Sequence, residues 1–195
     1  KYLYIWENLK LSLKKLYLYL LLTLPLFTVG QQQSINLSAT RDVMIREFNG
    51  SCDGNNYNTV QYINMHCWTN GGNLVNQYSL IDFNLNTIPV SANIFSAYLK
   101  LFVDMNVPTF PGGHSALSGS NQCDIVRVSS TWNENNIIWS TQPSTTNQNL
   151  TIINQSTSAN QNYTIDVTNL VQDMVNNPAT SFGFLIKLSN SNYYR

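Results

Sequence analysis

Charged and metal-binding residues are scarce in this chain of 195 residues. Asp, Glu, Lys and Arg make up only 10% of it, against roughly 25% in an average soluble domain. The formal net charge is zero, which argues against a nucleic-acid partner, because nucleic-acid binding needs a basic face. With only two His and three Cys, a zinc site built from these residues would use almost all of them.

Uncharged polar residues take the place of the missing charges. The chain holds 28 Asn, 11 Gln, 19 Ser and 16 Thr, together 74 of its 195 residues. Its surface must therefore present mostly amides and hydroxyls. Hydrophobic residues still amount to 43%, which provides a core and excludes the composition of a disordered chain. The length predicts one domain, or one domain with a targeting segment.

The N-terminal segment has the pattern of a secretory signal. Lys14 and Lys15 precede an apolar run over 16–29, and small residues follow before a Gln-rich stretch. The pattern predicts a signal peptide over 1–30, with 1–12 as read-through upstream of the true start. The alternative is a membrane anchor, although the run is shorter than the roughly 20 residues of a spanning helix. We expect a secreted or cell-surface protein that is not inserted in a membrane after signal cleavage.

The segment 31–195 is predicted to be one all-β module. Short apolar runs with period-two alternation are separated by Asn-Gly, Gly-Gly and Pro-Gly turns, which is typical of an antiparallel sandwich or barrel. The clearest alternating face comprises Ala97, Leu99, Leu101 and Val103. The predicted strands are Ile35–Ala39, Val43–Ile45, Ile81–Leu85, Ala97–Val103, Ile125–Val128, Ile137–Trp139, Ile152–Ile153, Tyr163–Val167 and Phe184–Leu188.

One helix is expected near the C-terminal end of this module. Apolar residues recur at helical spacing from Val167 to Val175, and Asn177-Pro178 ends the run. Asp166 or Thr168 can cap its first turn. The apolar stripe of this helix is expected to pack on the core.

The cysteines and one polar loop raise two further questions. Cys52 and Cys67 flank a polar, turn-rich segment, and either a disulfide or two buried thiols is compatible with their spacing. Cys123 is left over. The segment Asp53–Asn56 resembles the start of an oxygen-rich loop, so a structural calcium ion is a candidate cofactor, with ligands unassigned.

A tryptophan-rich segment is the densest in candidate binding residues. Trp132 and Trp139 bracket Glu134, and exposed rings beside amides and carboxylates would form a platform for sugars. Trp139 alternates with apolar Ile137 and is expected in the core, whereas Trp132 can be either core or platform. No pair of carboxylates can be assigned from the sequence, and no nucleophile elbow accompanies either histidine, so we predict no enzyme activity.

This segment, SSTWNENNIIWSTQP over 129–143, resembles the signature of DNRLRE domains. These are secreted β-sandwich modules whose relatives include alginate-associated carbohydrate-binding modules and disaggregatase-related repeats. Further similar stretches lie at 40–45, 79–89, 94–101 and 166–175. The resemblance implies a jelly-roll-like antiparallel β-sandwich with one short helix. It also implies a non-catalytic carbohydrate-binding module of a larger exported bacterial protein, with polysaccharide and neighbouring domains of that protein as partners.

If the resemblance holds, the candidate carbohydrate-binding residues are Trp132, Glu134 and Arg127. Ile81 stands where the family's "RFDL" element has its Arg, which puts a ligand contact at that position in doubt. Members of the family continue beyond the point where this chain ends, so we expect it to lack its last strand. The alternative function is a structural or adhesive surface module without a defined sugar site. A buried Trp132 ring would favour that alternative.

Overall fold

The structure is a computed structural model that describes residues 32–104, 114 and 119–191. The chain divides into two compact units, 1–36 and 37–195. The predicted signal peptide and the last four residues lie outside the described residues, and the strand that the family resemblance implies beyond residue 195 stays a prediction. In the part that is described, no helix is long and apolar enough to cross a membrane.

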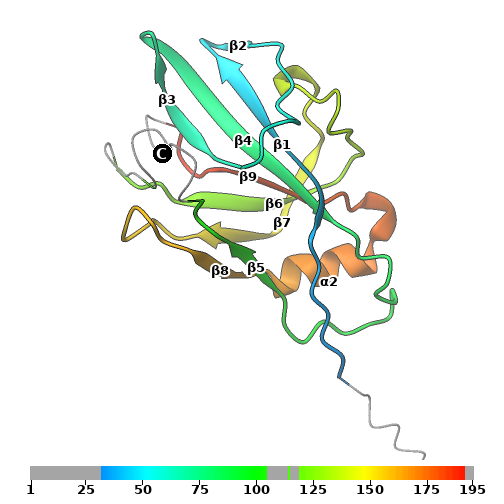
Figure 1. Cartoon of the computed structure of the whole chain (residues 1–195). Helices are drawn as coiled ribbons and strands as arrows, with labels where there is room; N and C mark the ends of the chain where they lie inside the picture. Colours follow the sequence, from blue (N-terminus) through cyan, green and yellow to red (C-terminus); the bar gives the residue numbers. More distant parts are fainter. Residues whose placement is uncertain (1–31, 105–113, 115–118, 192–195) are drawn as a thin grey trace, which may run out of the picture. The chain divides into compact units, whose positions relative to one another are not determined.

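The second unit contains a seven-stranded sheet in which all pairings are antiparallel (Figure 1). Its strand order is β2-β1-β4-β9-β6-β7, and β3 pairs with β4 beside β9. Two hairpins have two-residue turns with positive φ at both positions, Asn49-Gly50 and Gly71-Gly72, as the twist of paired strands requires. The strands are β1 (Ala39–Phe48), β2 (Ser51–Cys52), β3 (His66–Asn70), β4 (Asn73–Phe83), β6 (Cys123–Val128), β7 (Thr145–Ile153) and β9 (Phe184–Leu188).

A second sheet of two strands, β5 (Tyr98–Leu101) and β8 (Tyr163–Asp166), leads into the helix α2 (Thr168–Asn176). Asp166 Oδ1 accepts hydrogen bonds from Thr168 N at 2.9 Å and Thr168 Oγ1 at 2.6 Å, which satisfies donors at the start of the helix. Short 3₁₀ turns lie at η1 (Trp139–Thr141) and η2 (Pro178–Thr180). The predicted class, antiparallel β with one short helix near the C-terminal end, is confirmed.

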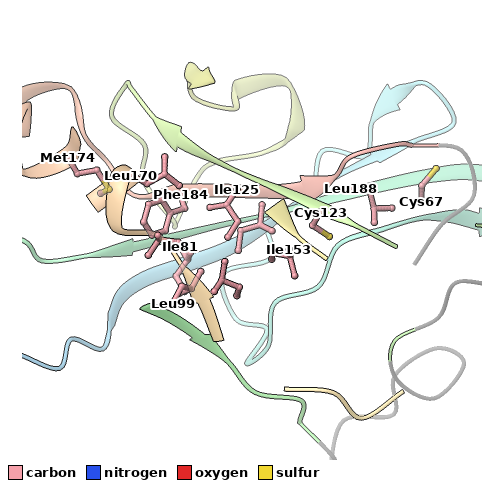
Figure 2. Close-up of a cluster of buried hydrophobic side chains, with 13 residues drawn as sticks. Cys67, Ile81, Leu99, Cys123, Ile125, Ile153, Leu170, Met174, Phe184 and Leu188 are labelled. Carbon is pink, nitrogen blue, oxygen red and sulfur yellow. The ribbon is translucent and has the colours of Figure 1, made fainter. Parts of the chain in front are cut away.

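One face of the large sheet packs against the small sheet and the helix (Figure 2). This first core contains buried side chains from all three parts, since β5 and β8 alternate between inward apolar and outward polar or aromatic positions. Its members are Cys67, Ile81, Leu99, Cys123, Ile125, Ile153, Ile165, Val167, Leu170, Met174, Phe184, Ile186 and Leu188.

The opposite face of the large sheet is covered by the long loop after β6. Trp132 and Ile137 from this loop pack on sheet residues that point away from the first core. The sheet members of this second core are Val43, Ile45, Leu80, Val126, Val128 and Leu185. The central strands β4, β6 and β9 of the large sheet are therefore buried on both faces, whereas the small sheet buries only its inner face.

The sequence predicted some strands well and others wrongly. The strand Phe184–Leu188 and the helix are confirmed. Ile137–Trp139 is not a strand, because Ile137 N bonds Asn133 O at 3.0 Å in a turn that anchors the covering loop. Ile35 also lies outside any strand and is 51% exposed. The strand β3 and most of β4 were missed.

Cys52 and Cys67 are thiols in the structure, so the disulfide alternative is not what the structure shows. The pairing register explains why. Cys52 pairs with Glu47, Glu47 with Asn76, and Asn76 with Cys67, so two strands separate the cysteines. Three strand spacings amount to about 14 Å, whereas a disulfide needs Cα atoms within about 7 Å.

Candidate functional site

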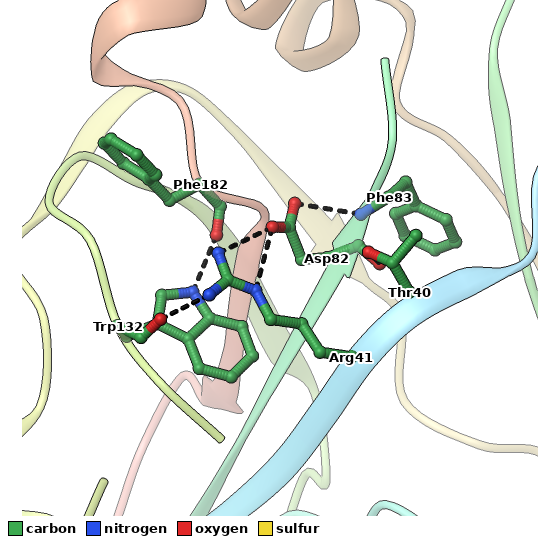
Figure 3. Close-up of polar contacts among 6 residues, drawn as sticks. All are labelled: Thr40, Arg41, Asp82, Phe83, Trp132 and Phe182. Carbon is green, nitrogen blue, oxygen red and sulfur yellow. Dashed lines mark hydrogen bonds and ion pairs between the residues drawn. The ribbon is translucent and has the colours of Figure 1, made fainter. Parts of the chain in front are cut away.

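Trp132 is a buried support of the second core. Its side chain is 7% exposed, and its indole Nε1 donates a hydrogen bond to Phe182 O at 2.8 Å. The guanidinium of Arg41 lies 4.1 Å from the ring centre and donates to Trp132 O, as Figure 3 shows. The buried ring, with Arg41 against it, fits a core support better than an open platform for sugars, and its edge also lines a cavity of about 320 Å³ together with Asn133 and Ile137.

Trp139 is the more accessible of the two tryptophans, contrary to expectation. It is half-buried, and its ring centre lies 4.6 Å from that of Tyr78 at an interplanar angle of 48°. Because η1 begins at this residue, the alternation with Ile137 that suggested a core position does not exist. Trp139 packs at the margin of the second core.

The other two predicted site residues do not converge with Trp132. Arg127 is 7% exposed and donates to Thr180 O at 2.9 Å and to Ser181 Oγ at 3.0 Å, so its guanidinium is enclosed by the protein. Glu134 is half-buried, and its backbone oxygen accepts a hydrogen bond from Asn56. Its carboxylate remains a predicted contact.

In the loop Asp53–Asn56, the predicted calcium loop, the carboxylate of Asp53 is hydrogen-bonded by other groups of the protein. Asp53 Oδ2 accepts from Arg46 Nε at 2.6 Å and from Tyr57 Oη at 2.5 Å, and Oδ1 accepts from Asn55 N at 3.0 Å. Burial opposes ionisation of Asp53, but these hydrogen bonds outweigh it and lower its pKa. Burial and Asp53 raise the pKa of Tyr57 to about 12. No cluster of three acidic, His or Cys side chains suited to a metal occurs within the described ranges, so calcium stays a prediction.

Exposed aromatic rings gather instead on the two-stranded sheet. Along β5 and just beyond it, Tyr98 is 58% exposed and Phe102 is 74% exposed, while Leu99 between them is buried. Lys100 lies between the two rings on the same exposed side. Four residues of extended chain span roughly 13 Å, so two rings of one face are held apart by more than a single pyranose ring.

The neighbouring strand β8 adds polar groups to this side. Asp166 pairs with Tyr98, Thr164 pairs with Lys100, and both β8 residues are exposed. The two hydrogen bonds from Thr168 lower the pKa of Asp166, which keeps a carboxylate at the surface. We call these five residues, Tyr98, Lys100, Phe102, Thr164 and Asp166, the outer face.

The outer face has the groups that a carbohydrate needs. An aromatic ring presents an apolar face with negative quadrupole potential to the C–H groups of a sugar, while an ammonium, a hydroxyl and a carboxylate can bond its hydroxyls. A signal for this site was present in the sequence: once Leu99 and Leu101 are assigned inward, Tyr98, Lys100 and Phe102 must point outward. The sequence-based prediction names only the inward positions of this strand, Ala97, Leu99, Leu101 and Val103.

Comparison with known families matches residues 33–195 to the family described as carbohydrate-binding module family 96. The match spans every strand of both sheets and the helix. No curated protein matches the chain.

Proposed function

Because the chain belongs to carbohydrate-binding module family 96, and is thereby a non-catalytic carbohydrate-binding module, we propose that its outer face holds a polysaccharide chain. The observation that carries the proposal is the pair of exposed rings, Tyr98 in β5 and Phe102 just beyond its end, at positions of the same alternation. Exposed apolar side chains that share one surface are typical of binding sites, so the two rings together support a ligand on this side.

The shape of the outer face favours a polymer over a single sugar. A two-stranded sheet offers a surface along which a chain can lie, and neither the cavity beside Trp132 nor the cleft at the end of β4 is lined by β5 or β8. Each ring can then stack on a different unit of one chain. Weak contacts on linked units add up because the second contact forms within the same molecule.

The rest of the proposal concerns the setting of the module. The basic and apolar pattern of 1–30 supports export to the cell surface or the medium. The signature over 129–143 supports a DNRLRE-type module within a larger exported bacterial protein. The buried Trp132 ring supports the adhesive alternative, in which the same fold spaces or anchors neighbouring domains and retains no particular glycan.

Affinity electrophoresis of the full chain through gels that contain neutral or acidic polysaccharides tests the proposal. We expect at least one polysaccharide to retard the protein, and the Tyr98→Ala/Phe102→Ala variant to lose that retardation. Tyr62→Ala is the matched control, since Tyr62 is also an exposed ring, at 37%, but lies on another segment. Retardation that survives the double variant would contradict the outer face as the site.

Two additions to the same gels separate the remaining alternatives. EDTA would reduce retardation if a structural calcium ion supports the fold or the site, and would leave it unchanged otherwise. A folded protein that no polysaccharide retards would favour the adhesive alternative.

A further inference from the structure

A cleft of about 610 Å³ shares no lining residue with the outer face. It is formed by the start of β1, the end of β4 with the segment after it, the last part of α2, and the chain around η2. Its volume is in the range of sites for small organic ligands, about 300–1,000 Å³.

The lining combines an apolar base with uncharged polar groups. Met174 and Val175 of α2 are buried, and Phe83 is half-buried. Asn84 and Asn86 are exposed, and each side-chain amide has donors for which no protein acceptor is found among the described residues. A sugar ring has the complementary form, since its C–H face is apolar and its hydroxyls project around the edge.

Charge in the cleft selects against an acidic sugar. The one charged lining residue is Asp82, and its Oδ2 accepts hydrogen bonds from Arg41 Nη2 at 2.8 Å and Nε at 3.1 Å. Arg41 is not a lining residue, and its guanidinium is engaged by Asp82 and Trp132 (Figure 3). Because Arg41 is already paired with Asp82, the described lining offers a uronate or sulfate no free cation that would offset the cost of desolvating its charge.

The wall of the cleft at Ser181 and Phe182 is held in place from behind. Trp132 Nε1 bonds Phe182 O, and Arg127 Nη1 bonds Ser181 Oγ. Gly183 follows with φ +93°, and a Cβ placed there would lie 2.3 Å from Ile81 O, so β4 and this wall are in backbone contact. A wall that is already ordered before binding lowers the entropic cost of binding a ligand.

We infer that this cleft is a second carbohydrate site, which takes a single neutral glycosyl unit, such as the end of a polysaccharide chain. The inference rests on the proposed function for the class of ligand, but none of its residues belongs to the outer face. Trp132 and Arg127, predicted as direct contacts, act here as positioning residues behind the wall.

Titration of the full chain with simple glycosides tests the inference by NMR of the backbone amides. The probes are the methyl glycosides of glucose, galactose, mannose and xylose, with methyl glucuronide as the acidic match for the glucoside. We expect one neutral glycoside to shift amides of Asp82–Asn86 and Ser181–Phe182, and the glucuronide to bind at least tenfold more weakly. Equal binding of the glucuronide, or shifts confined to the outer face, would overturn the inference.

Variants of the exposed residues Asn84 and Asn86 at the edge of the cleft test the inference without disturbing the core. Asn84→Ala/Asn86→Ala should weaken glycoside binding at least tenfold, whereas Asn93→Ala, an exposed residue of the same segment outside the lining, should not. If the rim variant changes nothing while Tyr98→Ala/Phe102→Ala abolishes polysaccharide retardation, the cleft inference fails and the proposed function stands. The reverse result would remove the outer face and keep the cleft.

Discussion

Two aromatic regions of this module contain similar residues and have opposite exposures. The loop after β6 brings Trp132 onto a face of the large sheet, where the ring is 7% exposed and bonded to Phe182. On the small sheet, Tyr98 and Phe102 face solvent at 58% and 74%. The difference lies in coverage: the centre of the large sheet is covered on both faces, whereas nothing in the described structure covers the outer face. Aromatic content alone therefore does not locate a sugar site.

Truncation of Trp132 should give the largest effect and should fall on stability. Trp132→Ala removes a buried ring and a hydrogen bond, so we expect a loss of about 3–5 kcal/mol in the free energy of unfolding. Urea denaturation followed by circular dichroism measures it. A loss below about 1 kcal/mol would mean that the ring is not the core element described here.

Truncation of Tyr98 or Phe102 should have the opposite outcome: it should weaken polysaccharide binding and leave stability nearly unchanged. Tyr98→Ala and Phe102→Ala should each weaken polysaccharide binding on the order of tenfold, which corresponds to about 1.4 kcal/mol. Their free energy of unfolding should change by less than about 0.5 kcal/mol, because exposed side chains contribute little to folding. Binding by calorimetry and stability by urea denaturation together check this. A large loss of stability with unchanged affinity would erase the contrast between the two regions.

The ion pair behind Trp132 should matter less than the ring itself. Arg41→Met removes the hydrogen bonds to Asp82 and the contact over the indole, and we expect a loss of about 1–2 kcal/mol. Arg41→Lys should rescue only part of it, because an ammonium cannot bond two groups in the planar geometry of a guanidinium. Full rescue by Lys would show that charge alone is required.

A smaller effect should appear as a pH dependence at Asp53. Its folded pKa lies below the ordinary value of 3.8, so the carboxylate stabilises the fold above that pH. This stabilisation is lost as pH falls through the folded pKa. Asp53→Asn should thus be less stable than the wild type near neutrality and should approach it below about pH 4. If the difference in the free energy of unfolding between the two proteins stays constant down to low pH, Asp53 is not held by Arg46 and Tyr57 as described.

The smallest effect concerns the thiols and changes no function. Cys52 is half-buried, and the hydrogen bond from Gly54 leads the contacts that lower its pKa. Cys67 and Cys123 are buried, and burial raises the pKa of Cys123 to about 12. A thiol reagent should modify Cys52 first in the native protein and all three cysteines of the chain in denaturant. A single reactive thiol in denaturant would reveal a disulfide.

The sequence predicted the fold where local pattern and burial agree. Phe184–Leu188 is apolar except for the half-buried Lys187, because β9 lies in the covered centre of the large sheet, and the helix ending at Asn176 has a clear apolar stripe. The apolar triplet Ile137–Trp139 misled the assignment. These residues are buried because a loop folds back onto the sheet. The local spacing of apolar residues does not indicate such a contact.

The candidate site was harder to predict for a similar reason. Trp132 has strong local signals, but its burial depends on Arg41, some ninety positions earlier, and on Phe182, fifty positions later. The outer face could have been found, since the exposed positions of β5 follow from its inward ones. The cleft could not, because its residues come from four separate segments.

We propose that polysaccharide binds on the outer face and not on the tryptophan segment. NMR titration of the full chain with fragments of a retained polysaccharide tests it most directly. We predict that amides of Tyr98–Phe102 and Thr164–Asp166 shift with ligand, while those of Thr131–Ile137 do not. Shifts centred on Thr131–Ile137, with β5 and β8 unchanged, would contradict the claim.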